Sequence, residues 1–184
     1  MTAPNSGHEV ARELNKVRQY RQYLPDPLSD DLLDTLLEIA RWTGSSRNTQ
    51  PWHFIVVTDK ERLRQLSEVR EAIGWVATAP AAIALVMNGA NPASESYDEG
   101  RVTERLLIGA HLLGLGGGTA WYGDESQQAR AKEILGIPAG RTARSLVALG
   151  SIITSRDPRP GAAAGGRKPL AELVSREQFG KSRS

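Results

Sequence analysis

The sequence contains no cysteine, which excludes disulfide bonds, thiolate catalysis and cysteine-ligated zinc or iron–sulfur sites. Long hydrophobic runs are also missing, since the longest apolar candidate, residues 79–87, has the length of a strand and is too short to cross a membrane. The first nine residues are polar and include an acidic side chain, unlike a signal peptide. We therefore expect a cytoplasmic protein without a membrane partner.

Neither sign of charge dominates the chain. Its 23 basic and 21 acidic residues leave a formal net charge of +2, and the basic residues form no run of five or six. A nucleic-acid-binding face would interleave basic and aromatic residues, and the sequence offers no such stretch. The composition therefore predicts no nucleic-acid partner, while a mildly basic surface suits a ligand that carries a phosphate.

Several signatures of catalysis by side chains are absent. The histidines His8, His53 and His111 lie far apart, and no nucleophile elbow or Ser-His-Asp pattern is present. The glycines of residues 114–118 follow a helical pattern, so they are not a dinucleotide-binding fingerprint, and no P-loop lysine follows them. No metal site is predicted. An enzyme with this inventory would need a cofactor to carry the difficult step.

The periodicity predicts one α+β domain over residues 1–184, with a loose tail at 1–7 and an extended tail with a short docking helix at 157–184. Helices followed by strands that alternate with helices predict a sandwich with a central mixed, mainly antiparallel sheet flanked by helices. We expect Ser29 and Ser126 to cap helices, and we interpret Asp98, Glu99 and Glu104 as charges at a helix N-terminus. The helical patterns cover residues 8–19, 32–40, 59–70, 97–113 and 126–135, and the strand patterns cover residues 53–58, 81–87, 119–122 and 145–153.

Two polar segments are candidates for ligand binding. Arg18 and Arg21 would share a helical face if the first helix continued, and two arginines on one face can bind a phosphate. Taken alone, that spacing is explained more simply by an ordinary solvated face. The loop at residues 45–52, Ser-Ser-Arg-Asn-Thr-Gln-Pro-Trp, carries hydroxyls and amides that match the edge of a pyrimidine-like ring. The alternative is a helix C-cap and turn.

In this order, the segments resemble the FMN-dependent nitroreductase family over nearly the whole chain. The resemblance comprises the basic segment at 18–21, the proline-containing turn at 25–27, the polar loop at 45–52, Gly-Leu-Gly at 114–116 and Gly-Arg-Lys-Pro-Leu at 166–170. It implies a homodimer that binds two FMN molecules at the subunit interface, with a domain-swapped C-terminal tail. The implied cofactor-binding residues are Arg18, Gln19, Arg21, Ser45, Ser46, Asn48, Gln50, Tyr122, Gly123 and Arg167.

Within that set the resemblance implies different roles. Arg18 and Arg167 would contact the FMN phosphate, and Arg21 would lie near the pyrimidine edge of the ring. The polar loop would come from the partner subunit, and Tyr122 and Gly123 would border the reactive nitrogen. Only one arginine remains where the family often has two, and Gly44 stands where a proline is common, so we expect weaker phosphate anchoring. We also expect a more open flavin face, because only about nine residues separate the strand at 81–87 from the helix at 97–113.

The implied activity is hydride transfer from NADH or NADPH through FMN to a nitro, quinone or enone-type acceptor, by a ping-pong route. No catalytic side chain is expected, since the flavin carries the chemistry. Two alternatives remain open at this point. One is a non-catalytic flavin-binding protein on the same scaffold, and the other is a flavin-dependent oxidase or a flavin-fragmenting enzyme.

Overall fold

The computed structural model describes residues 7–153 and 167–181. The chain divides into two compact units, residues 1–153 and 154–184. The first unit contains the sheet and helices α1 to α5, and the second contains the short helix α6 (Leu170–Leu173), within the expected docking segment. Most of the predicted loose tail at 1–7, and residues 157–166 of the predicted extended tail, lie outside the described residues. The single domain over 1–184 and the docking of its tail stay predictions.

A four-stranded sheet forms the centre of the first unit, in the order β1 (Trp52–Val57), β2 (Ala81–Met87), β4 (Thr142–Gly150) and β3 (Gly116–Trp121). All three strand pairs are antiparallel, and an isolated parallel bridge joins Gln19 to Gly117. The central strand β2 is buried along its whole length, which explains its uninterrupted apolar sequence. The predicted α+β sandwich is confirmed.

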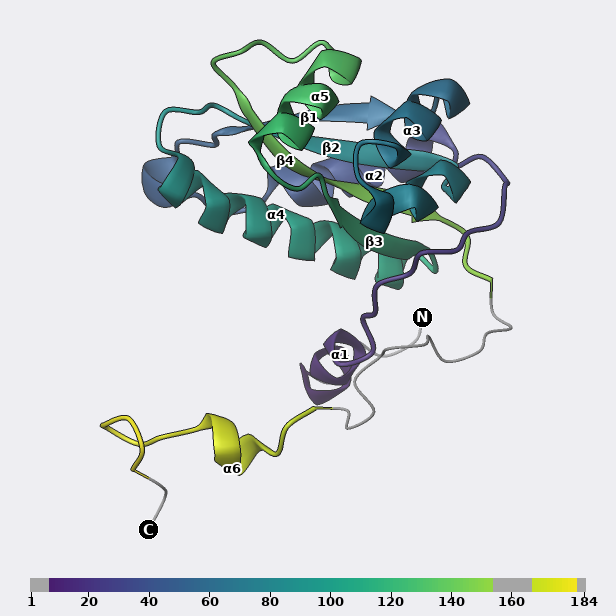
Figure 1. The fold of residues 1–184 in the computed structure, drawn as a ribbon. Helices are drawn as coiled ribbons and strands as arrows, with labels where there is room; N and C mark the ends of the chain where they lie inside the picture. Colours follow the sequence, from purple (N-terminus) through teal and green to yellow (C-terminus); the bar gives the residue numbers. More distant parts are fainter. Residues whose placement is uncertain (1–6, 154–166, 182–184) are drawn as a thin grey trace. The chain divides into compact units, whose positions relative to one another are not determined.

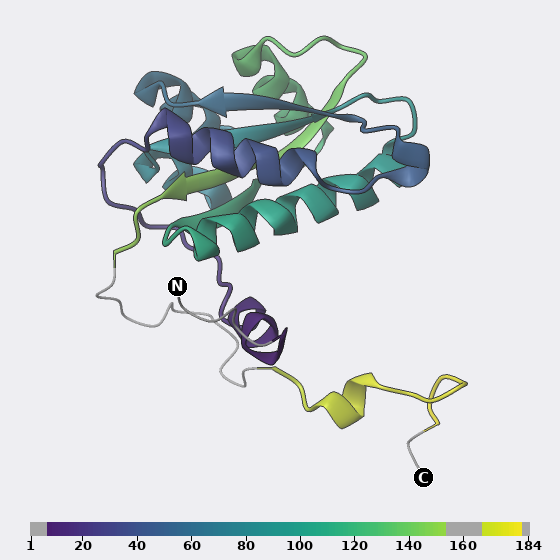
Figure 2. The same ribbon diagram turned by 180° about the vertical axis from the view of Figure 1, so that it is seen from behind.

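Helices cover both faces of this sheet (Figures 1 and 2). On one face α2 (Asp30–Arg41) and α4 (Pro92–Leu112) pack against Ile83 and Leu85 of β2. On the other face lie α3 (Lys60–Ser67), η2 (Glu71–Thr78) and α5 (Glu125–Leu135), over Ala82 and Ala84 of the same strand. Alternate β2 side chains therefore enter two separate hydrophobic cores. None of the helices in the described ranges combines the length and apolarity needed to cross a membrane.

Helix α5 begins at a different residue from the one expected. Asp124, not Ser126, is the N-cap, because its carboxylate accepts the Gln127 backbone N–H at 3.0 Å while the Gln127 side chain accepts the Asp124 N–H. This reciprocal arrangement is a capping box, which satisfies two backbone donors at once. The Ser126 hydroxyl donates to the same Asp124 carboxylate at 2.7 Å. The expected cap at Ser29 is confirmed, since its hydroxyl accepts the Leu32 N–H.

Helix α4 begins at Pro92, well before the predicted residue 97. The Asn91 side chain caps it by accepting the Ser94 N–H at 3.1 Å, and proline at the first helical turn needs no hydrogen-bond acceptor for its nitrogen. The buried carboxylate of Glu95 then accepts the backbone N–H groups of the preceding turn, from Gly89, Ala90 and Asn91. The connection from β2 therefore covers only residues 88–91, and the nine-residue connection on which we based a more open flavin face is wrong.

The acidic residues Asp98, Glu99 and Glu104 lie inside α4, so their interpretation as N-terminal charges is also wrong. Glu99 is buried, and its carboxylate accepts hydrogen bonds from the Arg144 guanidinium at 2.9 Å and from the Ser145 hydroxyl at 2.6 Å. A charged group this deep needs such partners, because desolvation penalises an unpaired carboxylate. The pair ties the long helix to β4.

Candidate functional site

The basic segment does not continue the first helix, so the expected helical face shared by Arg18 and Arg21 is wrong. Helix α1 spans Gly7–Leu14, and the following segment runs along the outer edge of β3. The Tyr20 N–H donates to the Gly117 carbonyl at 2.8 Å, and the Gln19 side-chain oxygen accepts the Thr119 N–H at 3.2 Å. An edge strand leaves backbone groups unpaired, and residues 19–23 satisfy some of those of β3.

The glycines at 116–118 form the first half of β3, which begins three residues before the predicted strand at 119–122. A Cβ atom on Gly118 would lie 2.1 Å from the Tyr20 carbonyl oxygen and 2.9 Å from the Tyr23 hydroxyl oxygen. Only glycine allows two backbones to approach this closely. The glycine run therefore determines how the basic segment lies against the sheet, and brings Gln19 and Arg21 to the β3 edge.

Arg18 and Arg21 are positive groups without a carboxylate partner in the described part of the chain. The Arg18 guanidinium donates to the carbonyls of Asn15 and Val17, at 2.6 and 2.7 Å, and the Arg21 guanidinium lies 5.8 Å from the centre of the Trp75 ring. A cation that no acidic side chain of the described residues neutralises is a favourable partner for an anion. This donor chemistry fits the phosphate and the electron-rich ring edge of FMN.

The corner at Tyr122 and Gly123 ends β3. The Tyr122 N–H donates to the Arg144 carbonyl at 2.9 Å, and its side chain is fully buried in the core, where burial raises the pKa of its hydroxyl well above the ordinary value. Gly123 is buried too, has φ of 116° and accepts a hydrogen bond from the Gln128 side chain at 2.7 Å. The Tyr122 side chain therefore points into the protein and does not face a ligand at this corner.

Two arginine–tryptophan pairs lie beside this edge, and sequence analysis missed three of the four residues. Arg70, the N-cap of η2, lies with its guanidinium 4.9 Å from the centre of the Trp121 ring of β3. Trp75 of η2 lies under Arg21. Arg70 and Trp121 are 51 positions apart, so no local spacing reveals the pair. The only available signal was an aromatic residue at the end of a predicted strand.

The polar loop contains a short helical turn, η1 (Ser46–Asn48), with an unusual backbone. Arg47, Asn48 and Gln50 all have positive φ, at 53°, 56° and 46°. The Ser45 hydroxyl accepts the Gln50 N–H at 2.8 Å and helps to hold this conformation. Ser46 and Asn48 are exposed, and their side chains form no hydrogen bond within the described ranges. Strained backbone with free polar side chains is typical of a segment that meets a ligand.

Replacing Arg47 by glycine is expected to stabilise the protein by about 0.5–1 kcal/mol, because glycine adopts positive φ without steric cost. The measurement is the urea midpoint at fixed protein concentration, with Arg105→Gly, at an exposed position inside α4, as the matched control. The control should lose about 1 kcal/mol, since glycine is unfavourable in a helix interior. A lower stability for Arg47→Gly would mean that the left-handed backbone carries no strain.

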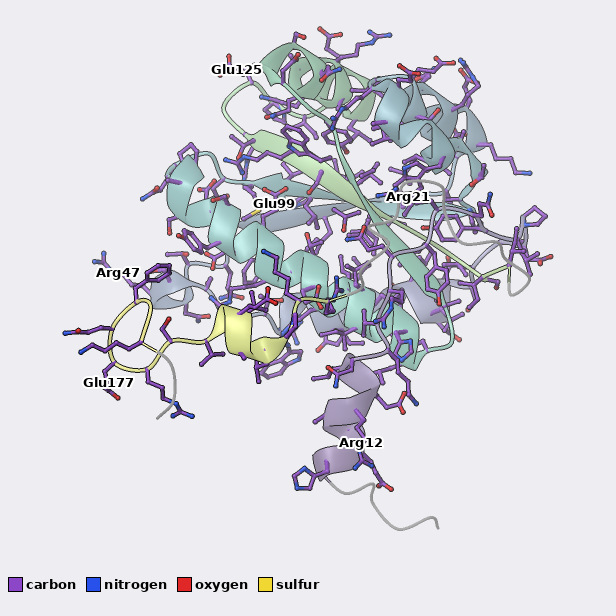
Figure 3. All side chains as sticks on the ribbon, turned by 60° about the horizontal axis from the view of Figure 1, so that its bottom comes forward. Arg12, Arg21, Arg47, Glu99, Glu125 and Glu177 are labelled. Carbon is purple, nitrogen blue, oxygen red and sulfur yellow. The ribbon has the colours of Figure 1, made fainter. Side chains whose placement is uncertain are left out.

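One copy of the chain does not bring all the expected cofactor residues together. Figure 3 shows Arg21 and Arg47, which mark the basic segment and the polar loop, on opposite sides of the long helix α4. Gln19, Arg21 and Gly123 lie along or beside β3, whereas Ser45, Ser46, Asn48 and Gln50 lie in or next to η1. Arg167 is exposed in the second unit. A ligand that uses both segments would therefore need two copies of the chain.

A separate hollow opens beside β1, lined by apolar side chains together with His53 and Arg141. None of the expected cofactor residues lines it. His53 is exposed, and no group of three histidine or acidic side chains in the described residues is arranged to hold a metal ion. The β3 edge remains the better candidate, because it combines cations, amides and aromatic rings.

Comparisons with known proteins identify related sequences. The nitroreductase family model matches residues 16–96. A candidate NADH dehydrogenase/NAD(P)H nitroreductase of Archaeoglobus fulgidus is 35% identical over 143 residues, which cover 72% of this chain and 79% of the relative. The Bacillus subtilis protein named FMN reductase [NAD(P)H] is 31% identical over 126 residues, 65% of this chain and 51% of that protein.

A solved structure shares the fold. The FMN-dependent nitroreductase from Clostridium difficile superimposes with a TM-score of 0.78 at 24% identity, over 91% of this chain and 98% of that one. At this identity the match establishes the fold alone. It is consistent with the two-faced sandwich described above.

Proposed function

Because the chain belongs to the nitroreductase family, we propose that it is an FMN-dependent NAD(P)H oxidoreductase that reduces a small nitro, quinone or enone-type acceptor. We propose further that it acts as a homodimer with an FMN at each of two equivalent interface sites. The similarity to relatives named NAD(P)H nitroreductase and FMN reductase supports this function. The observation that carries it is the pair of guanidiniums, Arg18 and Arg21, without carboxylate partners in the described residues.

The basic segment would hold the cofactor from one subunit. Arg18 would bind the phosphate, and Arg21 would stabilise negative charge at the pyrimidine edge, with Gln19 beside it. The Gly123 main chain would border the ring, and Tyr122 would support that corner from the core. When bound, FMN would take a hydride from NADH or NADPH and pass the electrons to the acceptor in a ping-pong sequence.

The polar loop would complete the site from the second subunit. Ser45, Ser46, Asn48 and Gln50 would contribute hydroxyls and amides, which match the donors and acceptors of a ribityl chain and a pyrimidine edge. The separation of this loop from the basic segment within one copy supports the dimer. We propose that Arg167 adds a second cation at the phosphate and that the C-terminal tail is exchanged between subunits.

An absorption spectrum of the purified protein tests the cofactor directly. We expect the yellow absorption of bound flavin, its loss on anaerobic addition of NADH or NADPH, and a mass in light scattering that corresponds to two chains. Arg21→Gln should weaken FMN about tenfold, whereas Arg130→Gln, at an exposed pair with Glu133 on α5, should leave it unchanged. A colourless monomer without FMN affinity would remove the proposal.

The same titration separates the alternative functions. A yellow protein that NADH and NADPH leave oxidised would be the non-catalytic flavin-binding protein. A protein that consumes oxygen in preference to the acceptors, or that converts its flavin to fragments, would be the oxidase or the flavin-fragmenting enzyme. Either result would contradict the proposed reaction while retaining the cofactor.

A further inference from the structure

We propose that Arg70 and Trp121 form a subsite that selects aromatic acceptors carrying a carboxylate. This inference rests on the proposed function and names the substrate class of that same site. Arg70 comes from the start of η2, and Trp121 is the last residue of β3. Neither belongs to the segments that we expect to hold FMN.

Arg70 lies directly against the corner where the flavin ring is expected. A Cβ atom built on Gly123 would be 3.2 Å from Cδ of Arg70, so the arginine stem covers that glycine. The guanidinium then crosses to Trp121, where it lies 4.9 Å from the ring centre and donates a long hydrogen bond of 3.5 Å to the Trp121 carbonyl. The cation is therefore held beside Gly123 by a ring and a carbonyl.

Within the described residues, no acidic side chain forms an ion pair with Arg70. The carboxylate of Asp124 feels the Arg70 charge, but it is already engaged by its helix cap. The pKa of Asp124 lies below its ordinary value first because its carboxylate accepts the Gln127 backbone N–H and then because it accepts the Ser126 hydroxyl, while the Arg70 charge contributes least. A guanidinium in contact with an indole still has N–H groups with which to bind a carboxylate in two places.

Trp121 supplies the aromatic part of the subsite. Its side chain is 51% exposed although it ends a central-sheet strand, and one part of its ring is covered by Arg70. An exposed indole beside a cation offers a planar surface for an aromatic ring and a charge for its acidic substituent. A benzoate that carries the reducible group fits both features, whereas a neutral aromatic acceptor uses only the ring.

The experiment compares 4-nitrobenzoate with 4-nitrotoluene, because they differ mainly in the charged group. Isothermal titration calorimetry on the oxidised protein gives each dissociation constant without turnover, and kcat/KM for both compounds is the second measurement. Arg70→Gln should weaken nitrobenzoate about tenfold and leave nitrotoluene within twofold. Arg70→Lys, which keeps the charge but loses the planar fork, should weaken nitrobenzoate about threefold. Arg62→Gln, an exposed arginine on nearby α3, should change neither.

Three outcomes would overturn the subsite. These are equal losses for both compounds in Arg70→Gln, no loss for either, or a tenfold loss of NADH affinity, which would assign the cation to the phosphates of the donor. Flavin content, read from the absorbance of each variant, separates this test from that of the proposed function. If the protein bound no FMN, the proposed function would fail, and calorimetry on the same protein would still decide whether an Arg70-dependent preference for the carboxylate exists.

Discussion

Substituting Gly118 with alanine is expected to destabilise the protein by about 3 kcal/mol and to abolish FMN binding. The added Cβ would lie 2.1 Å from the Tyr20 carbonyl oxygen, which is backbone and cannot rotate away. Either β3 or the basic segment must therefore move. Because Gln19 and Arg21 reach the sheet edge through this contact, their movement would disrupt the proposed cofactor site. Urea unfolding and flavin absorbance measure the two effects.

The matched control is Gly100→Ala on the exposed surface of α4, where nothing lies within 4 Å of the new methyl group. Alanine is the better helix former, so this variant should gain up to about 1 kcal/mol and keep its flavin. A Gly118→Ala protein with normal stability and normal FMN content would show that the segment at 19–23 does not need its close packing on β3.

The sequence predicted the layers of the fold because they follow from the local pattern of apolar residues. The unbroken apolar run at 81–87 could only be a strand buried on both faces, and its predicted bounds match β2. The start of α4 was missed because the pattern was judged from its apolar side chains. Its first turns contain polar residues whose partners are the backbone of the preceding turn and the strand β4. Caps and buried carboxylates depend on tertiary contacts, which periodicity does not record.

The candidate site likewise contains residues that the sequence predicted and residues that it did not. Gln19 and Arg21 could be chosen from the sequence because a short polar segment resembles that of a known family, yet their extended conformation depends on Gly116 and Gly118, about 100 residues away. The helical spacing of Arg18 and Arg21 was therefore misleading. The pairing of Arg70 with Trp121 could not be predicted from the sequence, since it arises only when η2 crosses the end of β3. Contacts between distant elements determine this half of the site.

Replacing Glu99 with glutamine is expected to lower the free energy of unfolding by about 2–3 kcal/mol. Removing one partner of a fully buried ion pair costs about 3–5 kcal/mol. We expect a smaller loss than this for Glu99→Gln, because a fifth of the Arg144 side chain stays exposed to solvent. Glutamine would leave the Arg144 guanidinium without its countercharge and weaken the contact with Ser145. The thermal midpoint should fall by roughly 5–10 °C for a chain of this size.

Losing the Glu99–Arg144 pair should also disturb the candidate site, because the Arg144 carbonyl accepts a hydrogen bond from the Tyr122 N–H next to Gly123. Glu133→Gln, which breaks an exposed pair on α5, should cost no more than about 0.5 kcal/mol and serves as the control. The double variant Glu99→Leu with Arg144→Leu should be more stable than either single leucine variant, since it leaves no uncompensated charge. Additive losses would show instead that the two residues act independently, and that the α4–β4 contact does not depend on their charges.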